Sequence, residues 1–191
     1  MNRTIKLLIF SSIFVDTGFG FIGPMLSIFI KENLIGGTIF TAGMASAVYL
    51  IVKSVLQLPF AHYVDKHDDK VKWLLVGTAA MAVVPFMYIF CANVWYIYLA
   101  QIFLGLGSAL AYPTWAGLWS THLDKRKESY EWSLYSTLTG LGTAIIASLG
   151  AAIAQWYSFE AAFALVGLLA VIGFVILLGL QKSDVKLLNK M

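Results

Sequence analysis

Six apolar segments, each long enough to cross a lipid bilayer, constrain this chain more than any other feature of its sequence. A membrane-spanning helix needs about 20 mostly apolar residues. Segments of this kind cover approximately residues 5–30, 38–60, 73–91, 95–119, 134–156 and 161–180. Charged residues make up only 12% of the 191 residues, whereas soluble domains carry about 25%. The sequence therefore predicts a single all-helical membrane domain of six spans over residues 1–191.

The distribution of Lys and Arg predicts the orientation of these spans. Cytoplasmic loops are enriched in basic residues. The two ends of the chain and the second and fourth loops hold Arg3, Lys6, Lys66, Lys70, Lys72, Lys125, Arg126, Lys127, Lys182, Lys186 and Lys190, whereas the other loops hold only Lys31. We therefore expect a multi-pass protein of the cell membrane with both termini in the cytoplasm. The first span also has the basic start of a signal peptide. No small-residue cleavage site follows it, so we expect it to be retained.

Polar residues are distributed unevenly among the predicted spans. The segment 161–180 has no hydroxyl, amide or charge, and 73–91 has only Thr78 and Tyr88. The other four segments carry several polar side chains each. Polar groups inside a membrane usually face other helices or water. We therefore expect the third and sixth spans to face lipid, and the other four to face protein or a water-filled cavity. Ordinary contacts between packed helices would explain many of the hydroxyls equally well.

Two charged residues lie deep within the predicted spans. Asp16 lies about 16 Å into the first span, and Lys53 lies about 10 Å from the cytoplasmic end of the second. A charge at such depth costs at least ~2.5 kcal/mol, so each needs water or a partner. We expect the two to be near neighbours beside a cavity, with Asp16 as a candidate proton carrier. The alternatives are a neutral, hydrogen-bonded Asp16 and a Lys53 that reaches back to the interface.

Three stretches resemble the major facilitator superfamily. The stretch FVDTGFGFIGPMLS (14–27) is similar to its first helix, and AQIFLGLGSALAYP (100–113) to its fourth, with Gln101 in place of the usual arginine. QLPFAHYVDK (57–66) is similar to the signature between helices two and three. Asp65, Lys66 and Lys70 match this signature, whereas Ala61 and Asp68 replace glycines and Val71 replaces a base. The chain is thus identified as a half-length member, because the family has twelve helices in two halves.

The resemblance implies a site and a partner. Helices one and four of the family line the cavity, and helices two and five join the halves, so a C2 homodimer through helices two and five would complete the fold. The candidate proton-coupling and cavity residues are Asp16, Lys53, Gln101, Tyr49, Tyr112 and Tyr135. Tight packing would explain the tyrosines equally well. The candidate cytoplasmic gate comprises Asp65, Lys66, Lys70, Arg126 and Glu131, although Arg126 and Glu131 would fit a merely solvated loop too.

These observations predict a function without catalysis. The three histidines lie in predicted loops, no Gly-rich phosphate loop is present, and the single cysteine forms neither an internal disulfide nor a cysteine metal cluster. We expect a proton-coupled secondary transporter of a small molecule that works by alternating access. We expect no enzyme activity, cofactor, metal or nucleic acid. The alternative is a non-transporting half-transporter relic that acts as a partner subunit or assembly factor.

Overall fold

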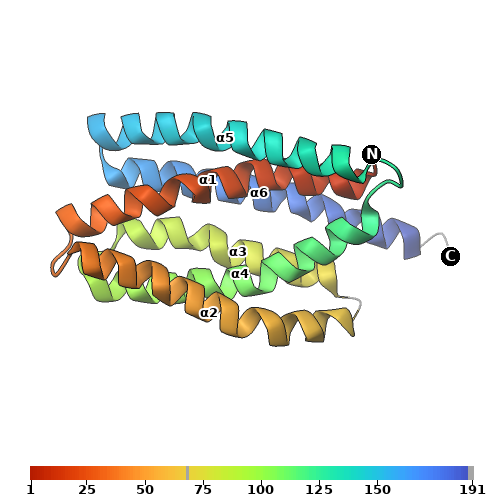
Figure 1. Cartoon of the computed structure of the whole chain (residues 1–191), viewed down its shortest axis with the longest axis horizontal. Coiled ribbons are helices and arrows are strands. Elements are labelled where there is room, and N and C mark those ends of the chain that lie inside the picture. The colour runs from red at the N-terminus through yellow and green to blue at the C-terminus, as the bar shows by residue number, and fades with distance from the viewer. Residues whose placement is uncertain (68, 189–191) are drawn as a thin grey trace.

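Six long helices make up the fold, and Figure 1 shows them side by side. The structure, a computed structural model, describes the backbone of residues 1–67 and 69–188 and the side chains through residue 180, residue 68 excepted. The helices are α1 (Arg3–Asn33), α2 (Ile39–Asp65), α3 (Lys70–Ile89), α4 (Val94–His122), α5 (Glu128–Trp156) and α6 (Phe159–Leu188). All six are long and apolar enough to cross a membrane, α6 over Phe159–Leu180. The predicted six-span, all-helical fold is confirmed.

The helices extend beyond the apolar segments because polar residues at their ends satisfy free backbone groups. The side chain of Asn2 accepts a hydrogen bond from the N–H of Thr4 at the start of α1, and that of Asn93 accepts from the first turn of α4. Thr38 and Thr41 form a reciprocal capping box at the start of α2. Polar residues also prolong α2 to Asp65 and start α5 at Glu128. Hydropathy alone therefore locates the spans but not their ends.

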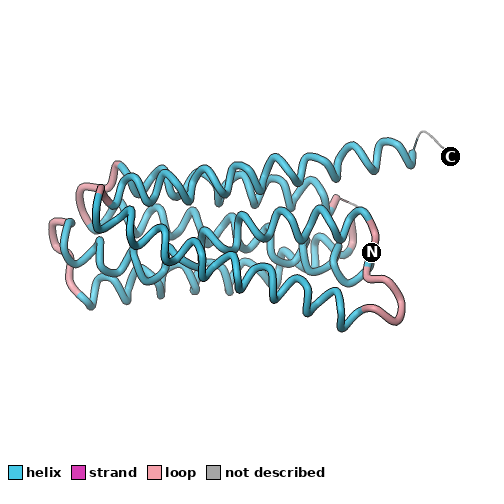
Figure 2. The backbone as a smooth tube through the Cα atoms, turned by 90° about the horizontal axis from the view of Figure 1, so that it is seen from above, coloured by secondary structure: helices cyan, strands magenta, loops and turns pink. Residues whose placement is uncertain are grey.

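The helices form two groups that meet along α3 and α6. One group contains α1, α5 and α6, and the other contains α2, α3 and α4 (Figure 1). The connecting loops gather at the two ends of the bundle, as the tube in Figure 2 shows. The start of α1 and the end of α6 lie at the same end (Figure 1), as an even number of spans requires.

Burial divides the helices into packed and uncovered ones. About half of the apolar span is buried in α1 and α4, whereas α2 buries 11% of its span and α5 only 6%. α3 and α6 are intermediate, because they contact each other as well as α4 and α1. The two helices that the resemblance assigns to contacts between halves are thus the two that this chain leaves uncovered.

Candidate functional site

A cavity of about 250 Å³ lies between the helices, and every helix contributes to its wall. α1 supplies Asp16, α2 supplies Tyr49 and Lys53, α4 supplies Tyr112, and α5 supplies Tyr135. The cavity thus brings together five of the six residues that the sequence suggested for coupling and substrate binding. The further lining residues are Ser11, Ser12, Val15, Phe19, Leu74, Thr78, Met81, Ser108, Ala111, Trp115 and Leu177.

Asp16 is paired with Tyr135 across the cavity wall. The hydroxyl of Tyr135 donates a hydrogen bond of 3.0 Å to Oδ2 of Asp16, which is exposed on the surface of the single chain. Close packing of α5 on α1 makes this contact possible. A Cβ on Gly142 would lie 2.5 Å from the Thr17 methyl group, so only glycine fits there without displacing its neighbour. Sequence reasoning proposed both residues but not their partnership.

Lys53 is held by aromatic rings. Its Nζ lies 5.0 Å from the ring centre of Tyr112 and 5.9 Å from that of Tyr49, within the range of cation–π interactions. Among the described side chains, no carboxylate oxygen lies within 4.0 Å of this nitrogen. Asp16 and Lys53 therefore share one cavity, as expected, but form no direct ion pair in this conformation.

Gln101 lies in a second cavity, of about 300 Å³, between α1, α2, α3 and α4. Its side chain is only 4% exposed, and its Oε1 has no hydrogen-bond partner in the described part of the chain. Phe19, Tyr49, Met81 and Ser108 line both cavities. Gln101 therefore lines a different cavity from Asp16, and the two cavities adjoin at these shared residues.

The third and sixth helices contribute more than the sequence suggested. Thr78 and Met81 of α3 and Leu177 of α6 line the first cavity. The expectation that these helices face lipid is therefore wrong for these three positions. Thr78 was one of only two polar residues in its predicted span, and this was the one signal in the sequence that pointed to a role inside the bundle.

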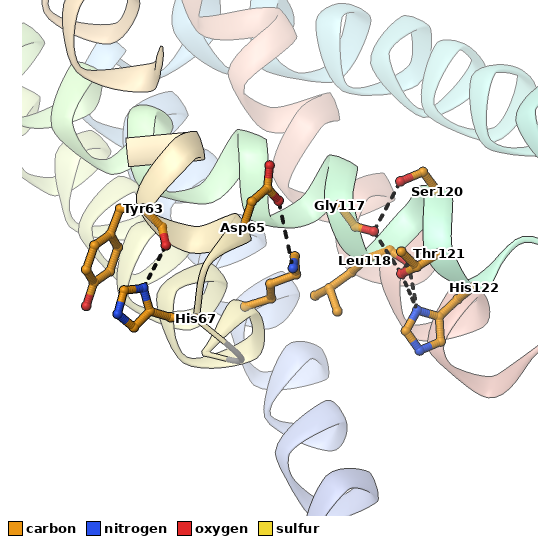
Figure 3. A network of polar contacts seen from close by, with 9 residues as sticks. Tyr63, Asp65, His67, Gly117, Leu118, Ser120, Thr121 and His122 are labelled. Atoms are coloured by element: carbon orange, nitrogen blue, oxygen red, sulfur yellow. Dashed lines mark hydrogen bonds and ion pairs between the residues drawn. The ribbon is translucent and has the colours of Figure 1, made fainter. Parts of the chain in front are cut away.

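The predicted gate residues lie at the loop ends of the helices. The Asp65 carboxylate lies 3.8 Å from Nζ of Lys70 (Figure 3), and its side chain is 75% exposed. Lys66 is exposed and ends α2, where its N–H donates to the carbonyl of Tyr63 and the N–H of His67 donates to that of Val64. Position 68, where the family signature has a glycine, lies outside the described residues. Asp65 and Lys70 thus link the ends of α2 and α3.

The other two gate candidates lie in and after the α4–α5 turn. Arg126 is exposed and has the left-handed φ of 67° that closes this turn. Glu131 is fully buried, and its Oε2 accepts a hydrogen bond of 3.2 Å from the N–H of Asp124. The Asp124 carboxylate lies 2.6 Å from the N-terminal amino group, and this contact lowers the pKa of Asp124. The Oε1 of Glu131 is buried without a hydrogen-bond partner among the described residues. Glu131 thus lies in the packed interior beside the turn and not in a solvated loop.

Comparisons with known proteins place the fold. A sequence model of the Major Facilitator Superfamily matches residues 8–190. An uncharacterized MFS-type transporter of Methanocaldococcus jannaschii is 24% identical over 159 residues, which cover 83% of this chain and 40% of the relative. A multi-drug resistance efflux pump PmrA homolog of Lactococcus lactis is 25% identical over 161 residues, or 82% of this chain and 38% of the relative. The chain thus spans about two fifths of the length of these curated relatives.

Two solved transporter structures share the fold. The POT family transporter PepTSo matches with a TM-score of 0.75 and 19% identity over 95% of this chain and 38% of its own. The peptide transporter POT in complex with alafosfalin matches with a TM-score of 0.80 and 12% identity over 95% of this chain and 39% of its own. In both, the six helices correspond to well under half of the solved chain.

Proposed function

Because the chain belongs to the major facilitator superfamily, whose members are transporters rather than enzymes, we propose that it is a secondary active transporter of a small molecule. It works by alternating access and couples transport to protons through Asp16. The observation that carries this proposal is the Asp16 carboxylate. It lies in the middle of α1 on the wall of a cavity, 3.0 Å from a tyrosine hydroxyl.

The surroundings of Asp16 argue for water or protein beside it. An ionisable group at this depth is costly in lipid and normally marks a pathway for ions or substrate. Asp16 is exposed in the single chain, and Tyr135 satisfies only one of its oxygens. A carboxyl that binds and releases a proton in an accessible cavity has the chemistry that proton coupling needs.

We propose that a second copy of the chain completes the transporter. α2 and α5 leave most of their spans uncovered, although both spans are apolar. A Cβ added to Gly43 of α2 or Gly140 of α5 would meet no atom within 4 Å, so both positions have room for a close neighbour. Four residues after Gly140 comes the exposed Ala144, and this spacing of small residues favours close packing of membrane helices.

The same arrangement gives the gate residues a role. With both termini in the cytoplasm, Asp65 lies at the cytoplasmic end of α2 with most of its carboxylate exposed. The turn before α5 carries Lys125, Arg126 and Lys127, all exposed. We propose that Asp65 and this basic turn of the second copy meet when the cytoplasmic side closes.

Cysteine cross-linking of the 191-residue chain in membranes tests the dimer. In a Cys91→Ser background, the pair Val55→Cys of α2 and Gly140→Cys of α5 is expected to form a disulfide-linked dimer, because both positions are uncovered and lie at similar depth, 16 residues from the same end of the bundle. Val55→Cys with Ala147→Cys is the matched control. Ala147 packs against the apolar core of its own chain, so this pair is expected to stay monomeric. Equal cross-linking of the two pairs, or none with Val55→Cys and Gly140→Cys, would count against the α2–α5 contact.

Transport is tested in proteoliposomes that carry a pH gradient and a pH-sensitive dye. The solutes offered are an amino acid, a dipeptide, a sugar, an organic acid and an aromatic cation. The wild type is expected to move protons with at least one of them, and Asp16→Asn to abolish this movement. Uptake with the same pH dependence in Asp16→Asn would overturn proton coupling. A strictly monomeric chain that moves none of them would favour the non-transporting partner subunit instead.

A further inference from the structure

We propose that the cavity binds an amphipathic organic anion, whose acidic group contacts Lys53 and whose aromatic or apolar body lies against Tyr49, Tyr112 and Trp115. This inference rests on the proposed transport function and names its substrate class. The observation behind it is a cation, Lys53, that lies between aromatic rings in the cavity wall and has no carboxylate partner among the described side chains.

Lys53 is the cation of the proposed site. Its ammonium lies 5.0 and 5.9 Å from the ring centres of Tyr112 and Tyr49, and no described carboxylate pairs with it. Ring faces attract a cation but accept none of its three N–H groups as a carboxylate or sulfonate oxygen does. An anion that enters the cavity would therefore gain a charge-assisted hydrogen bond that the protein itself does not make.

Two further donors lie in the same wall. The Nε1–H of Trp115 and the hydroxyl of Ser108 are buried and have no hydrogen-bond partner among the described residues. An indole N–H only donates, so it requires an acceptor. Both atoms are covered in this conformation, so a ligand reaches them only after a side-chain movement, and the preference for an anion rests on Lys53. An ammonium ligand would be repelled by Lys53.

The protein's own carboxylate does not fill this role. Asp16 is bonded to Tyr135, and it lies more than 4.0 Å from the Lys53 nitrogen. Among the described side chains, the titratable and charged groups that line this cavity are Asp16 from α1, Tyr49 and Lys53 from α2, Tyr112 from α4 and Tyr135 from α5; the described residues of α3 and α6 contribute none. Protonation of Asp16 therefore leaves Lys53 as the one charge in the cavity, and this state favours an anion most.

The cavity walls suit a small ring system. Tyr112 is 52% exposed, and the Trp115 ring stacks on Trp119 at 5.1 Å and 15°, which fixes its orientation. A volume of about 250 Å³ is below the range of about 300–1,000 Å³ that is typical for drug-sized ligands. We therefore expect a one- or two-ring anion rather than a large multi-ring compound.

Three probes of equal size and different charge test the proposal: naphthalene-1-sulfonate, 1-naphthylmethylammonium and 1-naphthalenemethanol. Binding to the purified full chain is measured by calorimetry in detergent. The sulfonate is expected to bind at least ~10-fold more tightly than either other probe. Lys53→Met should remove this preference and Lys53→Arg should keep it. Lys72→Met is the matched control, because Lys72 also lies over a ring, that of Trp73 at 5.8 Å, but outside the cavity.

The pH dependence provides an independent test. Because proton and anion binding in one cavity reinforce each other, sulfonate affinity should rise as the pH falls in the wild type. In Asp16→Asn the affinity should be high and independent of pH. Equal or tighter binding of the ammonium probe to the wild type would overturn the proposal, and this measurement needs no variant. Sulfonate binding that survives in folded Lys53→Met would overturn it as well.

Failure of this inference can be told apart from failure of transport. Binding in detergent requires no pH gradient and no second side of a membrane. Lys53-dependent sulfonate binding without any uptake in proteoliposomes would support the anion site and overturn the transport function. Asp16-dependent uptake of a cation or a sugar, without binding of the sulfonate, would support the transport function and overturn the anion site.

Discussion

The contact of α5 with α1 at Gly142 leads to a prediction about how closely these two helices pack. A Cβ at this position would lie 2.5 Å from the methyl group of Thr17, about 0.9 Å closer than the 3.4 Å of ordinary contact. Thr17 is 2% exposed, and its hydroxyl donates to the carbonyl of Ile13, so its methyl group cannot easily rotate away. Gly142→Ala therefore pushes α5 away from α1.

The expected cost follows from two opposing effects. Overpacking a filled site costs about 1–3 kcal/mol. Replacing Gly by Ala inside a helix gains about 1 kcal/mol. In the monomeric chain Gly140→Ala, on the same helix, brings only the gain in helix propensity, because no atom of the chain lies within 4 Å of its added Cβ. Gly142→Ala should thus be about 1–3 kcal/mol less stable than Gly140→Ala.

The assay is unfolding of the purified variants in mixed micelles, combined with a double-mutant cycle. Thr17→Ser removes the clashing methyl group and keeps the hydroxyl that bonds to Ile13. Gly142→Ala should therefore cost less in the Thr17→Ser background, with a coupling energy of about 1 kcal/mol or more. Equal stability of Gly142→Ala and Gly140→Ala, or additivity in the cycle, would refute this account of the α1–α5 contact.

Three further predictions concern coupling, gating and orientation. Tyr135→Phe removes the hydrogen bond to Asp16 and should move the pH of half-maximal uptake upward, because this bond stabilises the charged carboxylate; an unchanged profile would contradict the pairing. Asp65→Asn should destabilise the outward-open state and raise cytoplasmic labelling of a Ser108→Cys probe, whereas equal labelling would argue against the gate. Partial burial raises the pKa of the Cys91 thiol to about 11. An impermeant maleimide should therefore label this thiol slowly at about pH 8, and the labelling rate should rise about tenfold for each pH unit. Labelling should occur only from the outer side of the membrane. Labelling from the cytoplasmic side alone would reverse the orientation.

Apolar length was sufficient to predict the spans, because lipid requires every spanning segment to be long and to satisfy its own backbone. It was not sufficient for their ends. α5 begins at Glu128 rather than near residue 134, because its first turn is polar and lies beyond the apolar segment. The burial of Glu131, a predicted gate residue, was not foreseen for the same reason, since a carboxylate beside a run of charged residues resembles a solvated loop.

The cavity was predictable only in part. Asp16 and Lys53 were identifiable from the cost of a charge in the membrane, which depends on sequence position alone. Their partners depend on how each helix is rotated about its axis. That rotation is fixed by close contacts such as that of Gly142 with Thr17, which hydropathy does not reveal. The contribution of Met81 and Leu177 was missed for this reason, because apolar side chains give no sign of whether they face lipid or a cavity.

The position of Gln101 narrows which residues are able to couple protons to transport in this chain. It stands where the family usually has an arginine, and it lies in the second cavity, not beside Asp16. A glutamine carries no charge and does not titrate. Among the described residues that line the second cavity, Tyr49 alone has a titratable side chain, and it also lines the first. Since Lys53 is held by aromatic faces rather than by a carboxylate, the proposed coupling rests on one acid, Asp16, with Tyr135 as its hydrogen-bond donor.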